Sequence, residues 1–301
     1  MRVFVTGASG FIGRAVIAEL CGAGHRVVGL ARSQAAAAKV EAAGAEVHGG
    51  SLDDLASLRA GAAAADGVIH LAFDHDFSSS REAAARADTR AIETMGEVYA
   101  GSNRPLVIAS GLLGIAPGRV VTEADAAPSG WGRGASEVAV RALARRGVRT
   151  AAVRLPPSVH GRGDYGFVPL LIGAARQHGH AAYVGDGSNR WPAVHRLDAA
   201  RLFRLALEHA AAGSILHAVG DGGIPVRDIA AAIGRGLGVG VVSKTPAEAG
   251  PYYGFLATLI ALDTPAACDR TREQLDWHPT EPGLLADLAG DDYFAAAAAR
   301  A

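Results

Sequence analysis

Residues 1–13 constrain the fold of this chain more than any other segment. An apolar run at 2–6 has the composition of a buried β-strand, and glycines follow at positions 7, 10 and 13 before a helix-like stretch. In such a strand–turn–helix unit the first glycine permits the tight turn, the second lets a phosphate approach the backbone, and the third allows close helix packing. Free amides at the helix start then attract phosphate oxygens.

A glycine-rich turn is sometimes only a loop, but the strand before it and the helix after it favour a site for a dinucleotide pyrophosphate. The predicted phosphate-binding residues are Gly7, Ser9, Gly10, Phe11, Ile12 and Gly13.

The end of the second predicted strand, at 26–31, bears on which dinucleotide is bound. Folds that select NAD place an acidic residue there, against the ribose 2′-hydroxyl. This chain has Arg32 and Ser33 instead. A guanidinium pairs bidentately with a 2′-phosphate, and a serine hydroxyl adds a hydrogen bond. The alternative is that Arg32 is a solvated residue at a helix start. We expect NADP(H) as the cofactor, with NAD(H) as the less favoured alternative.

Short apolar or β-branched segments alternate with longer Ala-rich segments, the pattern of a parallel sheet covered by helices. Strands are predicted at 2–6, 26–31, 46–49, 67–72, 105–110 and 150–155, and a helix at 135–146. Proline and glycine then crowd into a loop at 156–169. Further strands are predicted at 181–184, 194–196 and 215–219, and further helices at 199–209 and 226–237.

The pattern predicts an α/β protein, a Rossmann doubly wound parallel sheet with a smaller C-terminal α/β substrate domain. The expected NADP-binding Rossmann domain spans residues 1–155. The expected substrate-binding region spans 156–301, with some segments at about 190–220 returning to the Rossmann domain.

Composition excludes several classes of partner. With 29 basic and 30 acidic residues the net charge is −1, so we expect no binding to nucleic acid or membrane surfaces. The two cysteines, Cys21 and Cys268, have no metal-ligand or redox spacing, and the eleven histidines are scattered, so no metal site is expected. The start has no secretory pattern, and no apolar run approaches the roughly 20 residues of a membrane span. We expect a cytoplasmic protein that acts on a small molecule.

These motifs resemble those of the extended short-chain dehydrogenase/reductases, also called the NAD-dependent epimerase/dehydratase family. The spacing Thr6-Gly7-x-x-Gly10-x-x-Gly13 matches that family, Val159-His160-Gly161 resembles its Val-Tyr-Gly, and Leu275-Asp276-Trp277-His278-Pro279 resembles its Leu-Gly-Trp-x-Pro. The segment from Gly187 to His195, with Asp198, resembles its substrate-domain signature. The resemblance implies a possible homodimer. It also implies further cofactor contacts at Leu52, Asp53, Leu71, Ala72, Arg133, Pro156 and Ser158.

The sequence departs from the family at the catalytic pair. Family enzymes use Ser or Thr after the fifth strand and a Tyr-x-x-x-Lys pair on the next helix, where Lys lowers the tyrosine pKa and holds the ribose. Ser110 is in place to hydrogen-bond a substrate oxygen. Alignment on Glu137 puts Arg133 at the Lys position and Ser129 at the Tyr position, and no Tyr-x-x-x-Lys occurs in the sequence. Arg133 keeps the charge but exchanges protons less readily than Lys.

Another residue must then transfer the proton. Tyr165 offers a phenolic proton and His160 an imidazole, and both lie in the loop after the sixth strand. Each has a structural alternative, a pocket-lining tyrosine and a packed loop histidine. The predicted catalytic residues are Ser110, Tyr165, Arg133 and His160.

Three functions fit these residues. The favoured one is an NADPH-dependent reductase of a carbonyl or conjugated double bond in a small organic molecule. A non-catalytic NADP sensor or scaffold would explain the absent Tyr and Lys. A nucleotide-sugar epimerase or dehydratase is less favoured, because oxidising an alcohol requires a base for its proton.

Overall fold

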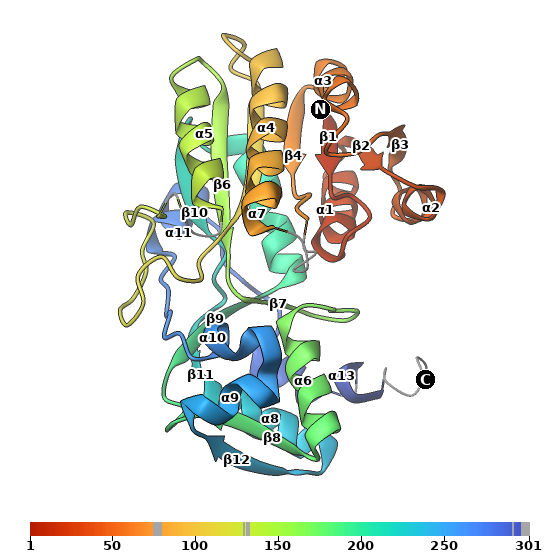
Figure 1. The fold of residues 1–301 in the computed structure, drawn as a ribbon. Coiled ribbons are helices and arrows are strands. Elements are labelled where there is room, and N and C mark those ends of the chain that lie inside the picture. Colours follow the sequence, from red (N-terminus) through yellow and green to blue (C-terminus); the bar gives the residue numbers. More distant parts are fainter. Residues whose placement is uncertain (75–79, 129, 131–132, 291, 296–301) are drawn as a thin grey trace.

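The computed structural model describes residues 1–74, 80–128, 130, 133–290 and 292–295. Its main feature is a seven-stranded parallel sheet with strand order β10-β6-β5-β4-β1-β2-β3 (Figure 1). The order reverses between β1 and β4, and ligands of such sheets bind at the carboxyl ends of the strands at that point. The strands are β1 (Arg2–Thr6), β2 (Arg26–Ala31), β3 (Glu46–Gly49), β4 (Gly67–His70), β5 (Pro105–Gly111), β6 (Arg149–Leu155) and β10 (Ser214–His217).

Helices cover both faces of this sheet, as Figure 1 shows. Three helices pack on one face: α1 (Phe11–Gly22), α2 (Gln34–Ala42) and α7 (Arg196–His209). Three pack on the other: α3 (Leu55–Ala63), α4 (Arg81–Val98) and α5 (Gly134–Ala144). Because both faces are covered, the central strands are apolar up to their carboxyl ends and do not alternate. The predicted doubly wound α/β fold is confirmed.

The strand predictions for β1, β2 and β3 are confirmed to the residue, whereas β4 ends at His70, two residues before the predicted end. Leu71 N still bonds Thr6 O at 3.2 Å, but Ala72 N donates to the Thr6 side-chain Oγ1 at 3.3 Å instead of to a neighbouring strand. The chain therefore bends away from the sheet at the phosphate loop. The predicted helix at 135–146 is α5, shifted to Gly134–Ala144.

The residues after β6 build a second, smaller unit, at the bottom of Figure 1. It contains a three-stranded sheet of β7 (Ser158–His160), β9 (Arg190–His195) and β11 (Asp221–Pro225), and a two-stranded sheet of β8 (His180–Val184) and β12 (Gly240–Lys244). Its helical segments are α6 (Phe167–His178), α8 (Val226–Leu237), α9 (Pro246–Tyr253), the 3₁₀ turn η1 (Gly254–Leu256), α10 (Ala257–Ile260), α12 (Leu284–Asp287) and α13 (Asp292–Ala295).

Two predictions for this unit are wrong in detail. The segment 156–169 is not irregular throughout, because Ser158–His160 pair in parallel with β9 and α6 begins at Phe167. The strand predicted at 194–196 is β9, and Arg196 belongs to α7. The His195 side chain accepts from Leu197 N at 3.3 Å, so it caps the helix and ends the strand.

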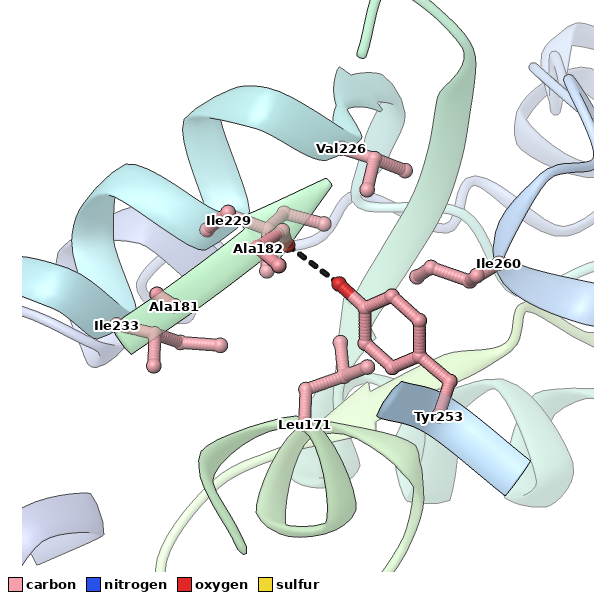
Figure 2. Close-up of a pocket in the computed structure, with 9 residues that line it drawn as sticks. Leu171, Ala181, Ala182, Val226, Ile229, Ile233, Tyr253 and Ile260 are labelled. Carbon is pink, nitrogen blue, oxygen red and sulfur yellow. Dashed lines mark hydrogen bonds between the residues drawn. The ribbon is translucent and has the colours of Figure 1, made fainter. Parts of the chain in front are cut away.

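The core of the second unit is apolar and closed. Figure 2 shows Tyr253 pointing at the backbone of Ala182, to whose carbonyl its hydroxyl donates. Leu171, Ile229 and Ile233 help to enclose a cavity of about 10 Å³ beside it, which is room for about one water molecule. This cavity is therefore a packing gap and not a substrate site.

Part of the later chain returns to the main sheet. The strand β10 pairs in parallel with β6, and α7 packs along α1. The helix α11 (Asp269–Leu275) packs against β10, and the fully buried Trp277 donates from Nε1 to Asp198 O at 3.0 Å. These contacts join the C-terminal segment to the part of the chain that forms the seven-stranded sheet.

Candidate functional site

The glycine-rich turn has the geometry that a phosphate cradle needs. Gly7 has a φ of +67°, and a Cβ there would lie 2.7 Å from Ala72 N. A Cβ on Gly13 would lie 2.1 Å from Gly7 O, so only glycine lets α1 pack this closely on the turn. Gly10 N donates to Gly7 O at 3.0 Å, and α1 then begins at Phe11. The first amides of the helix are thus turned toward the space beyond the turn.

The loop between β7 and α6 lies on this turn. Phe11 N donates to the phenolic oxygen of Tyr165 at 3.1 Å, and the two rings meet edge to face at 6.0 Å. Tyr165 is 61% exposed. Gly161 and Gly163 in the same loop have φ angles of +130° and +83°. The first helix amide therefore already holds an oxygen acceptor, at the place where a phosphate oxygen is expected.

Arg32 and Ser33 follow the end of β2, as predicted. Arg32 is exposed and makes no hydrogen bond or ion pair within the part of the chain that the structure describes. The Ser33 side chain caps α2 by accepting from Ala36 N at 3.2 Å, which leaves its own proton available. Beyond β3, Asp53 is exposed and Leu52 is half-buried against the helix-covered core.

A buried polar cluster lies at the carboxyl ends of β1 and β4. His70 Nδ1 is 2.7 Å from Thr6 Oγ1, and its Nε2 is 3.0 Å from Asp88 Oδ1. Asp88, on α4, also accepts from Arg133 Nη2 at 2.5 Å and from the Ser136 hydroxyl. Burial alone would raise the pKa of Asp88, but the Arg133 guanidinium and His70 hold that pKa well below its usual range.

Arg133, at the position aligned with the family lysine, is therefore already paired. Its Nη2 also donates to Ala72 O at 3.1 Å, and its guanidinium lies 4.7 Å from the centre of the Phe73 ring. These contacts fix the backbone just after β4, where the resemblance implies cofactor contacts at Leu71 and Ala72. Ser129, at the tyrosine position, lies outside the described residues.

Ser110 belongs to a second buried cluster, on the α5 side of the sheet. Its hydroxyl donates to Glu137 Oε1 at 2.7 Å, and Glu137 forms a two-point ion pair with Arg154 at 2.8 and 2.7 Å. Arg154 Nη1 lies 3.2 Å from His217 Nε2, and burial lowers the pKa of His217 to about 4. Because the Ser110 hydroxyl donates its only hydrogen to Glu137, it can only accept a hydrogen bond from any further group.

His160 is placed apart from Tyr165. It is fully buried, its Nδ1 lies 2.8 Å from Asp287 Oδ2, and its Nε2 has no hydrogen-bond partner among the described residues. Its ring contacts the His195 ring edge to face at 5.4 Å. Pro156 and Ser158 are buried where β6 passes into β7, and Ser158 Oγ likewise lacks a partner among the described residues.

Sequence reasoning missed Asp88 and missed the role of Glu137. Asp88 lies in a helix with many charged residues, so nothing in the pattern marks it as the buried one. Glu137 does carry a signal, because it shares a helix face with Val140 and Ala144, and a carboxylate on an apolar face needs a buried partner.

In the described part of the chain no three His, Cys, Asp or Glu side chains are arranged to hold a metal ion. No helix there is long and apolar enough to span a membrane.

The sheet order and the phosphate loop define a dinucleotide-binding Rossmann protein. The sequence model of the NAD dependent epimerase/dehydratase family matches residues 3–219, and the chain belongs to that family. An uncharacterised protein of Schizosaccharomyces pombe is 48% identical over 296 residues, which are 98% of this chain and 100% of that protein.

Two further comparisons involve named enzymes. A 4-hydroxy-2-methyl-3-oxo-4-farnesyl-3,4-dihydroquinoline-1-oxide ketoreductase of Stigmatella aurantiaca is 32% identical over 186 residues, 58% of this chain and 55% of that enzyme. The dTDP-glucose 4,6-dehydratase of Streptomyces venezuelae, solved with NAD bound, superposes with a TM-score of 0.78 at 20% identity, covering 98% of this chain and 97% of the other. That structure supports the fold alone.

Proposed function

We propose that this protein is an NADPH-dependent reductase of a carbonyl or a conjugated double bond in a small organic molecule. The observation that carries the proposal is the pairing of a preformed phosphate cradle with the unpaired Arg32 at the end of β2. The similarity to a ketoreductase over about half of each chain supports reduction as the chemistry.

The residues present fit a dinucleotide. The close approach of Gly7 and Gly13 to the backbone leaves the start of α1 open to phosphate, and the Phe11 amide already bonds an oxygen. Arg32 and the Ser33 hydroxyl would hold a 2′-phosphate. Leu52 and Asp53 would flank the adenine, and Leu71, Ala72, Pro156 and Ser158 the nicotinamide half. The bound coenzyme supplies the hydride.

Arg133 would act by position and not by proton transfer. Its charge is balanced by Asp88, and its bond to Ala72 O fixes the backbone beside the cradle. An arginine in an ion pair does not release its proton near neutral pH. We therefore assign Arg133 to orienting the ribose-facing backbone.

Tyr165 is the proposed proton donor. Its exposed phenol accepts from Phe11 N in this structure, and a phosphate oxygen requires that same amide. Coenzyme binding would free the phenol, because a phosphate oxygen would replace it as the acceptor of that amide. His160 is the weaker candidate, because it is buried and bonded to Asp287.

Oxidation of NADPH followed at 340 nm across a panel of aldehydes, ketones and enones tests the proposal. We expect turnover with NADPH that exceeds turnover with NADH by about tenfold or more. Tyr165→Phe should lower kcat by about a hundredfold or more while coenzyme affinity is retained or rises. Ser110→Ala, which removes the hydroxyl at the end of β5, should likewise lower turnover while coenzyme affinity is retained. No turnover in spite of measured NADPH binding would overturn the reductase.

A non-catalytic NADP-binding protein is the second candidate. The observation that favours it is the ion pair of Arg133 with the buried Asp88, which leaves the lysine position without a mobile proton. Such a protein would bind NADPH but show no turnover, either as the wild type or as Ser110→Ala or Tyr165→Phe.

The protein's location and assembly are also proposals. We infer a cytoplasmic protein, because Cys21 and Cys268 are both free, as in a reducing compartment. We also infer a homodimer through α4 and α5, because Val138 on α5 is 52% exposed. Light scattering should give twice the chain mass of 30.6 kDa, and Val138→Glu should shift the protein to monomer.

A further inference from the structure

Arg196 is a charged residue that neither the sequence motifs nor the two buried clusters account for. It is the first residue of α7, and its guanidinium lies 5.2 Å from the centre of the Phe11 ring. Its Nε is buried and has no hydrogen-bond partner among the described residues. A buried guanidinium nitrogen without a hydrogen bond costs folding free energy. Because Arg196 lies at the phosphate loop, we expect its Nε to bond an acceptor on a ligand.

The charges near Arg196 are mainly positive, although the Asp287 carboxylate also lies among them. Burial lowers the pKa of Arg196, the guanidinium groups of Arg14 and Arg162 lower it further, and Asp287 and Tyr293 offset this in part. Arg14 is anchored to the phosphate loop, since its Nε donates to Gly10 O at 3.4 Å. The positive end of α1 points into the same region. Like charges gathered without a bonded anion are expected where a multiply charged anion binds.

The phosphate loop identifies the anion. The amide of Phe11 bonds an oxygen acceptor, and the Phe11 ring lies beside the Arg196 guanidinium. One bound phosphate group would therefore contact both the Phe11 amide and Arg196. We propose that Arg196 binds the pyrophosphate of the coenzyme, as a cationic contact supplied by α7. This inference rests on the proposed dinucleotide site and adds a residue to it. It is separate from Arg32, which would meet only the 2′-phosphate.

Calorimetric titration of the full chain with NADP⁺, NAD⁺ and 2′-AMP tests this assignment. Arg196→Met keeps the apolar stem over Phe11 and removes the charge. Loss of a charge-assisted hydrogen bond should weaken NADP⁺ and NAD⁺ equally, by about tenfold to a hundredfold. Binding of 2′-AMP, which has no pyrophosphate, should be unchanged. Arg32→Ala should do the reverse, weakening NADP⁺ and 2′-AMP but not NAD⁺.

Two further variants serve as a rescue and as a control. Arg196→Lys restores the positive charge and should recover part of the affinity, whereas Arg59→Met, at an exposed position on α3, should change nothing. Equal NADP⁺ affinity in the wild type and Arg196→Met would overturn the assignment, and so would a loss confined to substrate KM or shared by 2′-AMP. A wild type that binds neither NADP⁺ nor NAD⁺ would instead overturn the proposed function itself.

Discussion

Two regions around the seven-stranded sheet differ in whether their polar side chains are hydrogen-bonded within the chain. Behind β4, β5 and β6, the clusters around Asp88 and Glu137 are buried, and each carboxylate bonds to an arginine of the chain. At the phosphate loop and the end of β2, Arg32 has no polar partner and Arg196 leaves its Nε unbonded, among the described residues. Polar groups that satisfy one another stabilise the fold, whereas groups with open bonding capacity mark where a ligand gains free energy.

The largest effect on coenzyme binding should come from closing the phosphate cradle. Gly13→Ala places a Cβ 2.1 Å from Gly7 O, so α1 must shift away from the turn. Coenzyme affinity should fall by about a hundredfold or more. The matched control is Gly22→Ala at the far end of α1, where a Cβ meets nothing within 4 Å. Calorimetry measures both variants, and unchanged affinity in Gly13→Ala would show that phosphate does not bind at this turn.

The next effect concerns the bonded region and should appear in stability, not in binding. Arg154→Met leaves Glu137 buried without its main partner and should lower the free energy of unfolding by about 3–5 kcal/mol. Arg141→Met is the control, because Arg141 is 40% exposed and lies 3.9 Å from the same carboxylate. Its cost should be below about 1 kcal/mol. Urea unfolding that gives the two variants equal stability would contradict the distinction between the two regions.

Taken per pH unit, the smallest change in stability should come from the titration of His217. Burial lowers its pKa from 6.5 to about 4, so the unfolded chain binds a proton that the folded chain does not over this range. The stabilisation is present above pH 6.5 and is lost as the pH falls toward 4, at about 1.4 kcal/mol per pH unit. His217→Gln, which keeps a donor and an acceptor, should reduce this slope in urea unfolding at several pH values. An unchanged slope would assign it to other groups.

The same two regions differ in how much of their structure could be predicted from the sequence. The glycines at 7, 10 and 13 and the apolar strands are local patterns, so the first three strands and the phosphate loop were predictable. The partners of Ser110 and Arg133 were not, because Glu137, Arg154 and Asp88 come from separate elements that meet only in the folded sheet. The sequence predicts Arg196 as the end of a strand, because no local pattern shows that the His195 cap starts α7 at Arg196, beside Phe11.

The most direct test is a calorimetric titration of the wild-type protein with NADPH and with NADH. If amides at the start of α1 hold the pyrophosphate and Arg32 holds the 2′-phosphate, both coenzymes should release or absorb heat, and NADPH should bind about tenfold or more tightly than NADH. The preference should disappear in Arg32→Ala. Absence of heat with both coenzymes would contradict the assignment of this site to a dinucleotide.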